Sequence, residues 1–129
     1  MSIKLPSELP VMELPHTSLF PGVRLPLYIF ENRYRKMLID VIESERVFCI
    51  GTINENSASN PEEPSISPYS TAGLLRACVE NTDGTSNVIL EGLIRVKFVK
   101  WIHKKVYKLA QIEPIFSVTQ DLIEAELLC

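Results

Sequence analysis

The sequence has few of the residues that usually mark a redox, metal or phosphate site. Its three cysteines, Cys49, Cys78 and Cys129, are an odd number without close spacing, so we expect neither a disulfide framework nor a zinc site. The five glycines form no phosphate-binding loop, and no hydrolase or metalloprotease motif occurs. We therefore predict a chain without catalytic residues, metal sites or cofactors.

Long hydrophobic runs are also absent. No apolar stretch approaches the ~20 residues needed to cross a bilayer, and the N-terminus lacks the pattern of a signal or transit peptide. The 129 residues, 46% of them hydrophobic, suit one globular domain. The net charge of −3 argues against a protein made mainly to coat nucleic acid. We expect a cytoplasmic domain with no membrane partner.

Proline is plentiful near the N-terminus, where five of the nine prolines fall within the first 26 residues. Because proline has no backbone N–H, this segment should follow sheet edges and turns. Residues 10–14 are predicted as a short strand and residues 19–22 as a turn. From Val23 to Phe30 apolar residues alternate, which predicts a half-buried strand with Pro26 on its outer side.

The next stretch has the periodicity of a helix. An apolar stripe recurs at helical spacing between Asn32 and Ser44, and its members are Tyr34, Met37, Leu38, Val41 and Ile42. Acceptor oxygens of Glu31 or Asn32 are expected to cap the first turn. We therefore predict a helix over residues 32–44 with one face packed on the domain.

Further strands are indicated by β-rich runs between turn residues. Residues 47–53 are almost continuously apolar, which is typical of a central strand. Residues 54–71 have little to bury and hold three prolines, so they are predicted to form a mobile surface loop. The remaining strands are expected at 73–79, 88–90, 95–102 and 106–115.

In the strand expected at 95–102, the alternation of apolar residues is interrupted. Val96 and Phe98 share one face, but Val99 and Trp101 continue the apolar set on the other. One extra residue near 98–99 restores a single buried face, so the pattern predicts a β-bulge.

A domain over residues 1–118 is expected to be followed by the start of a helical segment, residues 119–129. An isolated helix this short is not stable in water. It therefore either docks on the domain or continues in a longer chain, and we expect the second. Its apolar residues also suit self-association.

Two aromatic residues are candidate binding residues. Tyr28 and Trp101 are large and amphipathic, as interface anchors often are, although each equally suits the wall of a barrel. Residues 95–108 hold six of the thirteen Lys and Arg residues and no acid, which makes an RNA-binding module an alternative. Because the whole chain is acidic, we favour a lysine-rich hairpin face that discourages edge-to-edge association.

Several motifs resemble one protein family. They are Leu14-Pro15, Phe20-Pro21-Gly22, Pro26-Leu27-Tyr28-Ile29-Phe30-Glu31, Arg33-Tyr34 and, further on, Leu90-Glu91-Gly92-Leu93-Ile94-Arg95. In this order and spacing they resemble the N-terminal (substrate-binding) domain family of Lon proteases. Asn32 departs from the proline that the family often has there. The resemblance covers residues 9–116.

The resemblance implies both a fold and a role. The fold is mainly β with helices (α+β), a PUA-like antiparallel pseudobarrel with the 32–44 helix packed against it. The role is that of a non-catalytic module that binds unfolded or tagged polypeptides, as a stand-alone domain protein or as part of a longer Lon-type protein. The ATPase and peptidase activities of Lon are not carried over, because their motifs are missing from this sequence.

Overall fold

The computed structural model describes residues 5–54 and 65–115. The elements are β1 (Glu8–Pro15), β2 (Arg24–Ile29), α1 (Asn32–Glu43), β3 (Val47–Asn54), β4 (Ser65–Ile66), β5 (Tyr69–Glu80), β6 (Ser86–Ile102) and β7 (Lys108–Pro114). The prediction of a mainly β domain with one packed helix is confirmed. The predicted helical segment 119–129 lies outside the described residues.

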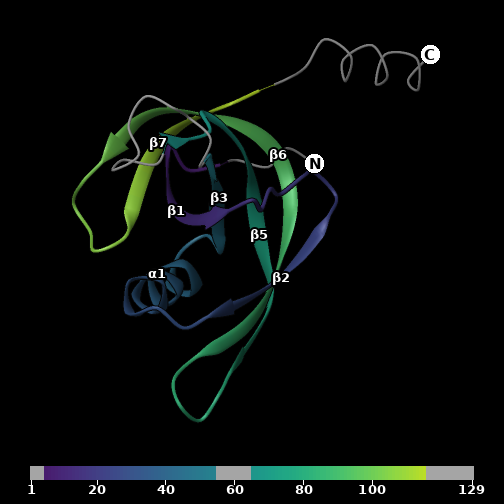
Figure 1. The fold of residues 1–129 in the computed structure, drawn as a ribbon, viewed down its shortest axis with the longest axis vertical. Helices are drawn as coiled ribbons and strands as arrows, with labels where there is room; N and C mark the ends of the chain where they lie inside the picture. Colours follow the sequence, from purple (N-terminus) through teal and green to yellow (C-terminus); the bar gives the residue numbers. More distant parts are fainter. Residues whose placement is uncertain (1–4, 55–64, 116–129) are drawn as a thin grey trace.

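Five strands close into a ring. Pairing runs in the order β1-β7-β6-β5-β3, and β3 then pairs with β1. The β1–β3 pair is parallel, because the chain crosses over through β2 and α1 between them, and the other pairs are antiparallel. Figure 1 shows the strands curving around a common centre, with α1 below β1 and the β5–β6 hairpin projecting beyond β2.

The prolines of β1 occupy positions where this strand has a single neighbour. β1 pairs with β7 through residues 8–11 and with β3 through residues 11–15, so the two registers overlap at Val11. Pro10 lies opposite Leu109 of β7, and Pro15 lies opposite Ile53 of β3. The expectation of an edge strand is thus wrong for β1 as a whole, although each proline avoids the doubly paired position. β2, which pairs with β6 alone, is the expected edge strand.

The core consists of two hydrophobic clusters on opposite faces of β3. Phe48 and Ile50 pack in the cluster that includes the buried side of α1, whereas Val47 and Cys49 pack in the other. Burial of both faces explains why this strand is almost continuously apolar, and its predicted central position is confirmed. Burial also raises the pKa of the Cys49 thiol to about 12.

α1 confirms the predicted apolar stripe but not the predicted cap. Its buried residues are Tyr34, Met37, Leu38 and Val41, while Ile42 is exposed. Glu31 occupies the N-cap position without a side-chain capping hydrogen bond. Its backbone carbonyl accepts hydrogen bonds from the N–H groups of Tyr34 and Arg35 at 3.0 and 2.9 Å.

β6 is one strand of 17 residues where two were expected, at 88–90 and 95–102. The shift in its register with β7 between Phe98 and Lys100 confirms the predicted bulge. Val99, the extra residue, is 51% exposed, while the rings of Phe98 and Trp101 approach to 5.0 Å between centroids.

Within the predicted loop 54–71, the described residues 65–71 are largely strand. Ile66 in β4 pairs with β3, and β5 begins at Tyr69, which pairs with Lys97 of β6. Ser70 and Thr71 look loop-like in sequence but are buried, and the Ser70 hydroxyl donates a hydrogen bond to the Ile50 carbonyl at 2.5 Å. Tertiary pairing therefore outweighs local composition here. Residues 55–64 lie outside the described residues.

Candidate functional site

The start of β2 is fixed by a close backbone contact with Gly92 of β6. The Gly22 N–H donates to the Gly92 carbonyl at 2.8 Å, and the Gly92 N–H donates to the Val23 carbonyl at 2.9 Å. A β-carbon on residue 92 would lie 2.1 Å from the Phe20 carbonyl oxygen. Gly22 itself has φ +80°, a conformation that glycine adopts readily. The Phe20-Pro21-Gly22 motif thus contacts Gly92 of the motif at residues 90–95, and this contact fixes the start of β2.

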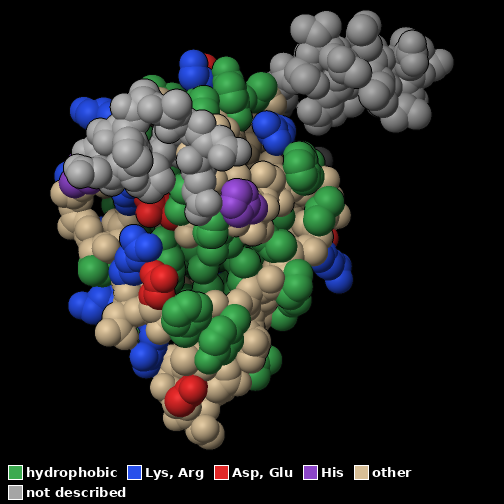
Figure 2. All heavy atoms as spheres, viewed as in Figure 1, with side chains coloured by type: hydrophobic (Ala, Val, Ile, Leu, Met, Phe, Trp, Pro, Cys, Tyr) green, Lys and Arg blue, Asp and Glu red, His purple; other side chains and the backbone are tan. Residues whose placement is uncertain are grey.

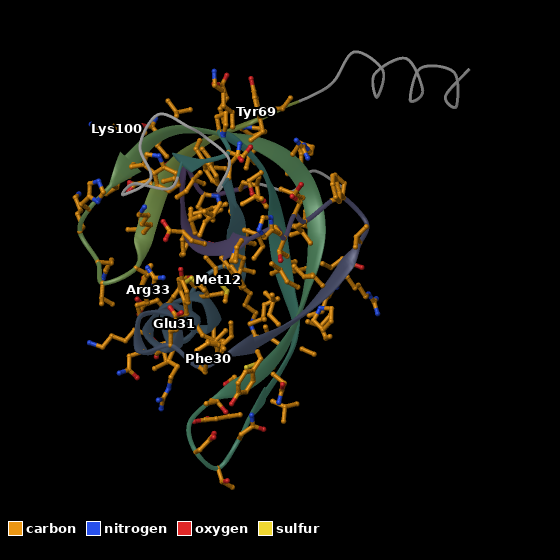
Figure 3. All side chains as sticks on the ribbon, in the orientation of Figure 1. Met12, Phe30, Glu31, Arg33, Tyr69 and Lys100 are labelled. Atoms are coloured by element: carbon orange, nitrogen blue, oxygen red, sulfur yellow. The ribbon has the colours of Figure 1, made fainter. Side chains whose placement is uncertain are left out.

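The β1–β2 groove, about 430 Å³ in volume, opens between the end of β1, β2 and the first turn of α1. Figure 2 shows hydrophobic side chains gathered across the middle of this face, and Figure 3 places Met12 there with Phe30 and Glu31 nearby. Most of the lining is apolar. The lining residues are Met12, Glu13, Leu14, Pro15, Thr17, Leu25, Pro26, Leu27, Tyr28, Phe30, Glu31 and Tyr34.

Two exposed aromatic side chains form the outer rim of the β1–β2 groove. The rings of Tyr28 and Phe30 stack with 5.6 Å between centroids. Tyr28 is 49% exposed and Phe30 is 57% exposed. Large aromatic surfaces left in water in this way are typical of contact sites for another molecule.

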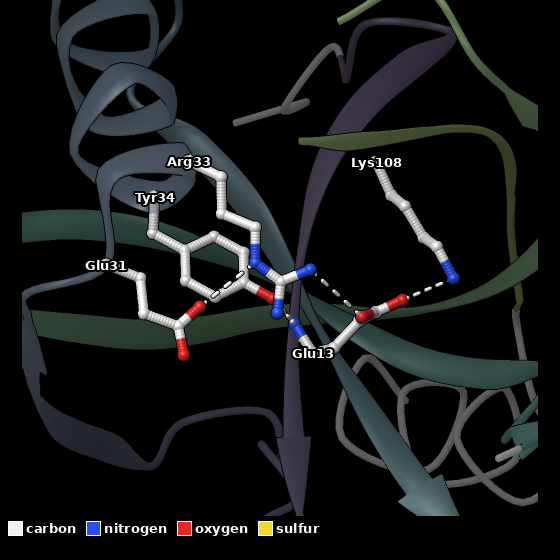
Figure 4. Close-up of polar contacts among 5 residues, drawn as sticks. All are labelled: Glu13, Glu31, Arg33, Tyr34 and Lys108. Atoms are coloured by element: carbon white, nitrogen blue, oxygen red, sulfur yellow. Dashed lines mark hydrogen bonds and ion pairs between the residues drawn. The ribbon is translucent and has the colours of Figure 1, made fainter. Parts of the chain in front are cut away.

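A cluster of charged groups lies at the rim on the side of α1, where Glu13 and Glu31 line the groove and Arg33 and Lys108 pair with them (Figure 4). The Arg33 guanidinium lies 2.9 Å from the Glu31 carboxylate and 3.6 Å from that of Glu13. Lys108 from β7 lies 2.5 Å from the other oxygen of Glu13. Two carboxylates and two cations therefore balance, so this rim has no net charge. The Tyr34 hydroxyl completes the cluster by accepting a hydrogen bond from the Glu13 N–H at 3.0 Å.

The environment of this cluster shifts two pKa values upward. Partial burial opposes the charged form of Arg33, but the Glu31 hydrogen bond and the surrounding negative charges outweigh it and raise the pKa. Burial is the main cause that raises the pKa of Tyr34. Arg33 thus remains a cation and the Tyr34 hydroxyl remains protonated, which suits a fixed structural rim.

A second depression, the β5–β6 hollow, lies next to the groove and shares three residues of β2 with it. It has a volume of about 360 Å³ and its lining is again mostly apolar. Its residues are Pro26, Leu27, Tyr28, Ala77, Val79, Asn87, Val88 and Ile89. β2 therefore borders two apolar depressions.

The two predicted binding residues are not brought together. Tyr28 lines the β1–β2 groove and the β5–β6 hollow, whereas Trp101 lines neither. Trp101 is half-buried against the second core cluster, and the Lys108 ammonium lies 5.4 Å from the centroid of its ring. In the basic stretch 95–108, Lys108 is paired with Glu13, while Lys100 is exposed on β6. RNA binding by this stretch stays a prediction.

Of the residues that line the groove, the sequence singled out only Tyr28 as a candidate. Phe30 follows the same alternation that puts Tyr28 on the outer face of β2, so the pattern contained a signal for it. The wall formed by β1 and Tyr34 had no such signal, because it depends on how the sheet closes. Among the described residues, no group of His, Cys, Asp and Glu is arranged to hold a metal ion, and no helix is long and apolar enough to span a membrane.

The ring-shaped sheet, the single packed helix and the apolar groove define a class, that of small β domains with a ligand-sized depression on the surface. The chain belongs to the family of the ATP-dependent protease La (LON) substrate-binding domain, whose model matches residues 8–127. The resemblance noted in the sequence is thereby confirmed.

Relatives and solved structures agree with this assignment. The chain is similar to the Lon protease of Flavobacterium johnsoniae, with 26% identity over 124 residues, which are 95% of this chain and 15% of that protein. It is also similar to the Lon protease of Anaeromyxobacter dehalogenans, with 27% identity over 129 residues, 96% of this chain and 15% of that protein. The chain thus spans about 15% of the length of these curated relatives.

Two solved structures share the fold. The Lon N-terminal domain protein from Xanthomonas campestris superposes with a TM-score of 0.68 at 19% identity, covering 95% of this chain and 72% of that one. The N-terminal domain of the Mycobacterium avium complex Lon protease superposes with a TM-score of 0.66 at 12% identity, covering 86% of this chain and 56% of that one. The predicted fold class is therefore confirmed.

Proposed function

We propose that this substrate-binding domain is a non-catalytic module that binds unfolded polypeptide segments in the β1–β2 groove. The observation that carries the proposal is the stacked, exposed pair Tyr28 and Phe30 on the rim of an apolar depression. The names of the relatives, which are Lon proteases, support a polypeptide as the ligand. In a longer protein, binding here would hold a polypeptide for a peptidase located elsewhere in the chain.

The chemistry of the groove suits ligands that differ in sequence. Removing apolar surface from water contributes about 25 cal/mol per Å² without requiring a fixed geometry. The balanced charges of Glu13, Glu31, Arg33 and Lys108 favour neither an acidic nor a basic ligand. An unfolded chain exposes the large apolar side chains that a folded chain buries in its core, so the groove would favour the unfolded state.

Fluorescence anisotropy with a labelled unfolded protein tests the proposal. Reduced, carboxymethylated α-lactalbumin is titrated with the purified domain, and native α-lactalbumin serves as the folded competitor. We expect saturable binding of the unfolded form, and a loss of affinity of roughly tenfold for Tyr28→Ala and for Phe30→Ala.

The chain supplies matched control variants for both substitutions. Tyr69 is 47% exposed and Phe20 is 53% exposed, close to the values for Tyr28 and Phe30, but neither lines the β1–β2 groove. Tyr69→Ala and Phe20→Ala are therefore expected to leave the affinity within twofold of the unchanged protein. Equal losses in all four variants would contradict a role for the groove, and absence of binding by the folded domain would contradict the proposed function.

A further inference from the structure

β2 has one edge that no strand of the described chain covers. The Val23 carbonyl accepts a hydrogen bond from Gly92, so at this position the backbone faces β6. Backbone groups alternate in direction along a strand, and those of Arg24, Pro26 and Tyr28 therefore face the opposite edge. In the part of the chain that the structure describes, β2 pairs with β6 alone.

The opposite wall of the groove does not offer an equivalent edge. Residues 12–15 of β1 are paired with β3 on one side. On the groove side, the Glu13 N–H already donates to the Tyr34 hydroxyl at 3.0 Å. In the described chain, β2 is therefore the wall of the groove whose edge is free of strand pairing.

The two depressions that β2 borders suit the alternating side chains of an extended chain. The β1–β2 groove adjoins the unpaired edge of β2, whereas the β5–β6 hollow extends from β2 over the paired strands β6 and β5, and Pro26, Leu27 and Tyr28 line both. Successive side chains of a strand point in opposite directions. A strand added along the free edge would thus direct one set of side chains into the groove and the other onto the outer face of β2, beside Pro26 and Tyr28, where the hollow begins.

We propose, building on the proposed function, that the polypeptide binds in extended form as an added strand along the free edge of β2. The backbone of Tyr28 and of Arg24 supplies the hydrogen bonds, and the groove and the outer face of β2 take alternate side chains. The preferred ligand is a segment that is apolar on both faces. Such segments form the central strands of folded proteins and are exposed when those proteins unfold.

Pro26 determines which kind of strand the edge accepts. Its backbone faces the free edge but has no N–H, so the edge offers a carbonyl and no donor at that residue. A second copy of β2 laid antiparallel along this edge would bring two such prolines into one short ladder, and both chains would lack donors. A segment of another polypeptide, without proline, keeps its own N–H groups to donate. The edge therefore suits a foreign strand better than a second copy of this chain.

Backbone N-methylation of a bound peptide tests the added strand. Overlapping ten-residue peptides of α-lactalbumin are ranked by anisotropy, and the tightest binder is then synthesised with a single N-methyl group at each position in turn. N-methylation removes one donor and leaves the side chain in place. We expect losses of about tenfold at alternate positions over one stretch of the peptide and little change at the positions between them.

Pro26→Ala gives the complementary test on the protein. This change adds an N–H to the free edge and leaves the β2–β6 hydrogen bonds in place. We expect the peptide to bind about two- to tenfold more tightly, which corresponds to one additional net hydrogen bond. Thermal unfolding of the variant verifies its fold, and the N-methyl scan on the unchanged protein does not depend on it.

Three outcomes distinguish binding as an added strand from binding in the groove without strand pairing. Alternating losses together with tighter binding by Pro26→Ala support the added strand. Peptide binding that is lost in Tyr28→Ala, but shows no alternation and no gain in Pro26→Ala, overturns the added strand and leaves binding in the groove intact. Binding of no peptide, or binding unaffected by Tyr28→Ala, overturns both.

Discussion

The hydroxyl of Tyr34 accepts a hydrogen bond from the backbone N–H of Glu13 at 3.0 Å. This bond joins the first turn of α1 to β1, and both residues line the β1–β2 groove. Two segments that are distant in sequence thus meet through one side-chain oxygen, in an environment where the tyrosine is buried.

Tyr34→Phe is expected to destabilise the domain by about 1–3 kcal/mol, because the Glu13 N–H loses its partner in a partly buried position. The free energy of unfolding in urea measures the effect. Tyr28→Phe is the matched control, since Tyr28 is half exposed, and it should stay within about 0.5 kcal/mol of the unchanged protein. Equal stability of the two variants would show that the Tyr34 bond is not formed in solution.

Gly92→Ala is expected to destabilise the domain by about 1–3 kcal/mol or more, because the new β-carbon would lie 2.1 Å from the Phe20 carbonyl oxygen. The backbone cannot move away without losing the hydrogen bonds that Gly92 makes with Gly22 and Val23. Chemical denaturation gives the change, and anisotropy should show weaker peptide binding because the start of β2 shifts.

Gly22→Ala is the control for Gly92→Ala, because it introduces backbone strain without a steric clash. A β-carbon there meets nothing within 4 Å, so the cost comes from the positive φ alone and should be about 1–2 kcal/mol. A Gly92→Ala variant as stable as the unchanged protein would contradict the close contact.

Trp101→Ala is expected to reduce stability rather than affinity. The ring is half-buried and packs 5.0 Å from that of Phe98, so its removal should cost about 1–3 kcal/mol. Urea unfolding and peptide anisotropy are measured on the same preparation. Affinity that falls as much as in Tyr28→Ala, with stability unchanged, would instead support Trp101 as a binding residue.

Acid should weaken the link between β2, β5 and β6. Hydrogen bonds from Arg76 and then from Arg24 hold the pKa of Glu91 below its usual value of 4.5. A carboxyl group with a depressed pKa in the folded state stabilises the fold above the unfolded-state pKa. That stabilisation is lost as the pH falls from about 4.5 through the lower pKa of the folded state.

Glu91→Gln tests this pH dependence. At pH 7 the variant should unfold at a lower urea concentration than the unchanged protein, because the two arginine contacts lose a charge. At pH 3 the difference should be smaller, because pH 3 lies below the unfolded-state pKa of Glu91 and the stabilisation declines progressively below that value. A stability difference that is the same at both pH values would rule out the proposed linkage.

Local patterns determined much of the fold. The helical spacing of Tyr34, Met37, Leu38 and Val41 identified α1, and the alternation from Val23 to Phe30 identified β2 as an edge strand. The fault in alternation after Phe98 located the bulge of β6. These features follow from periods of 3.6 and 2 residues along the chain, so they can be read without knowledge of distant contacts.

The tertiary structure alone decided where the apolar groove lies. The groove combines the end of β1, β2 and the first turn of α1, and the parallel pairing of β1 with β3 brings these segments together. The same closure buries one side of Trp101 and leaves Tyr28 exposed, although both aromatics looked alike in sequence. It also turns the loop-like residues Ser70 and Thr71 into buried strand. Such outcomes depend on which strands become neighbours, and that choice depends on the whole set of long-range pairings rather than on any local pattern.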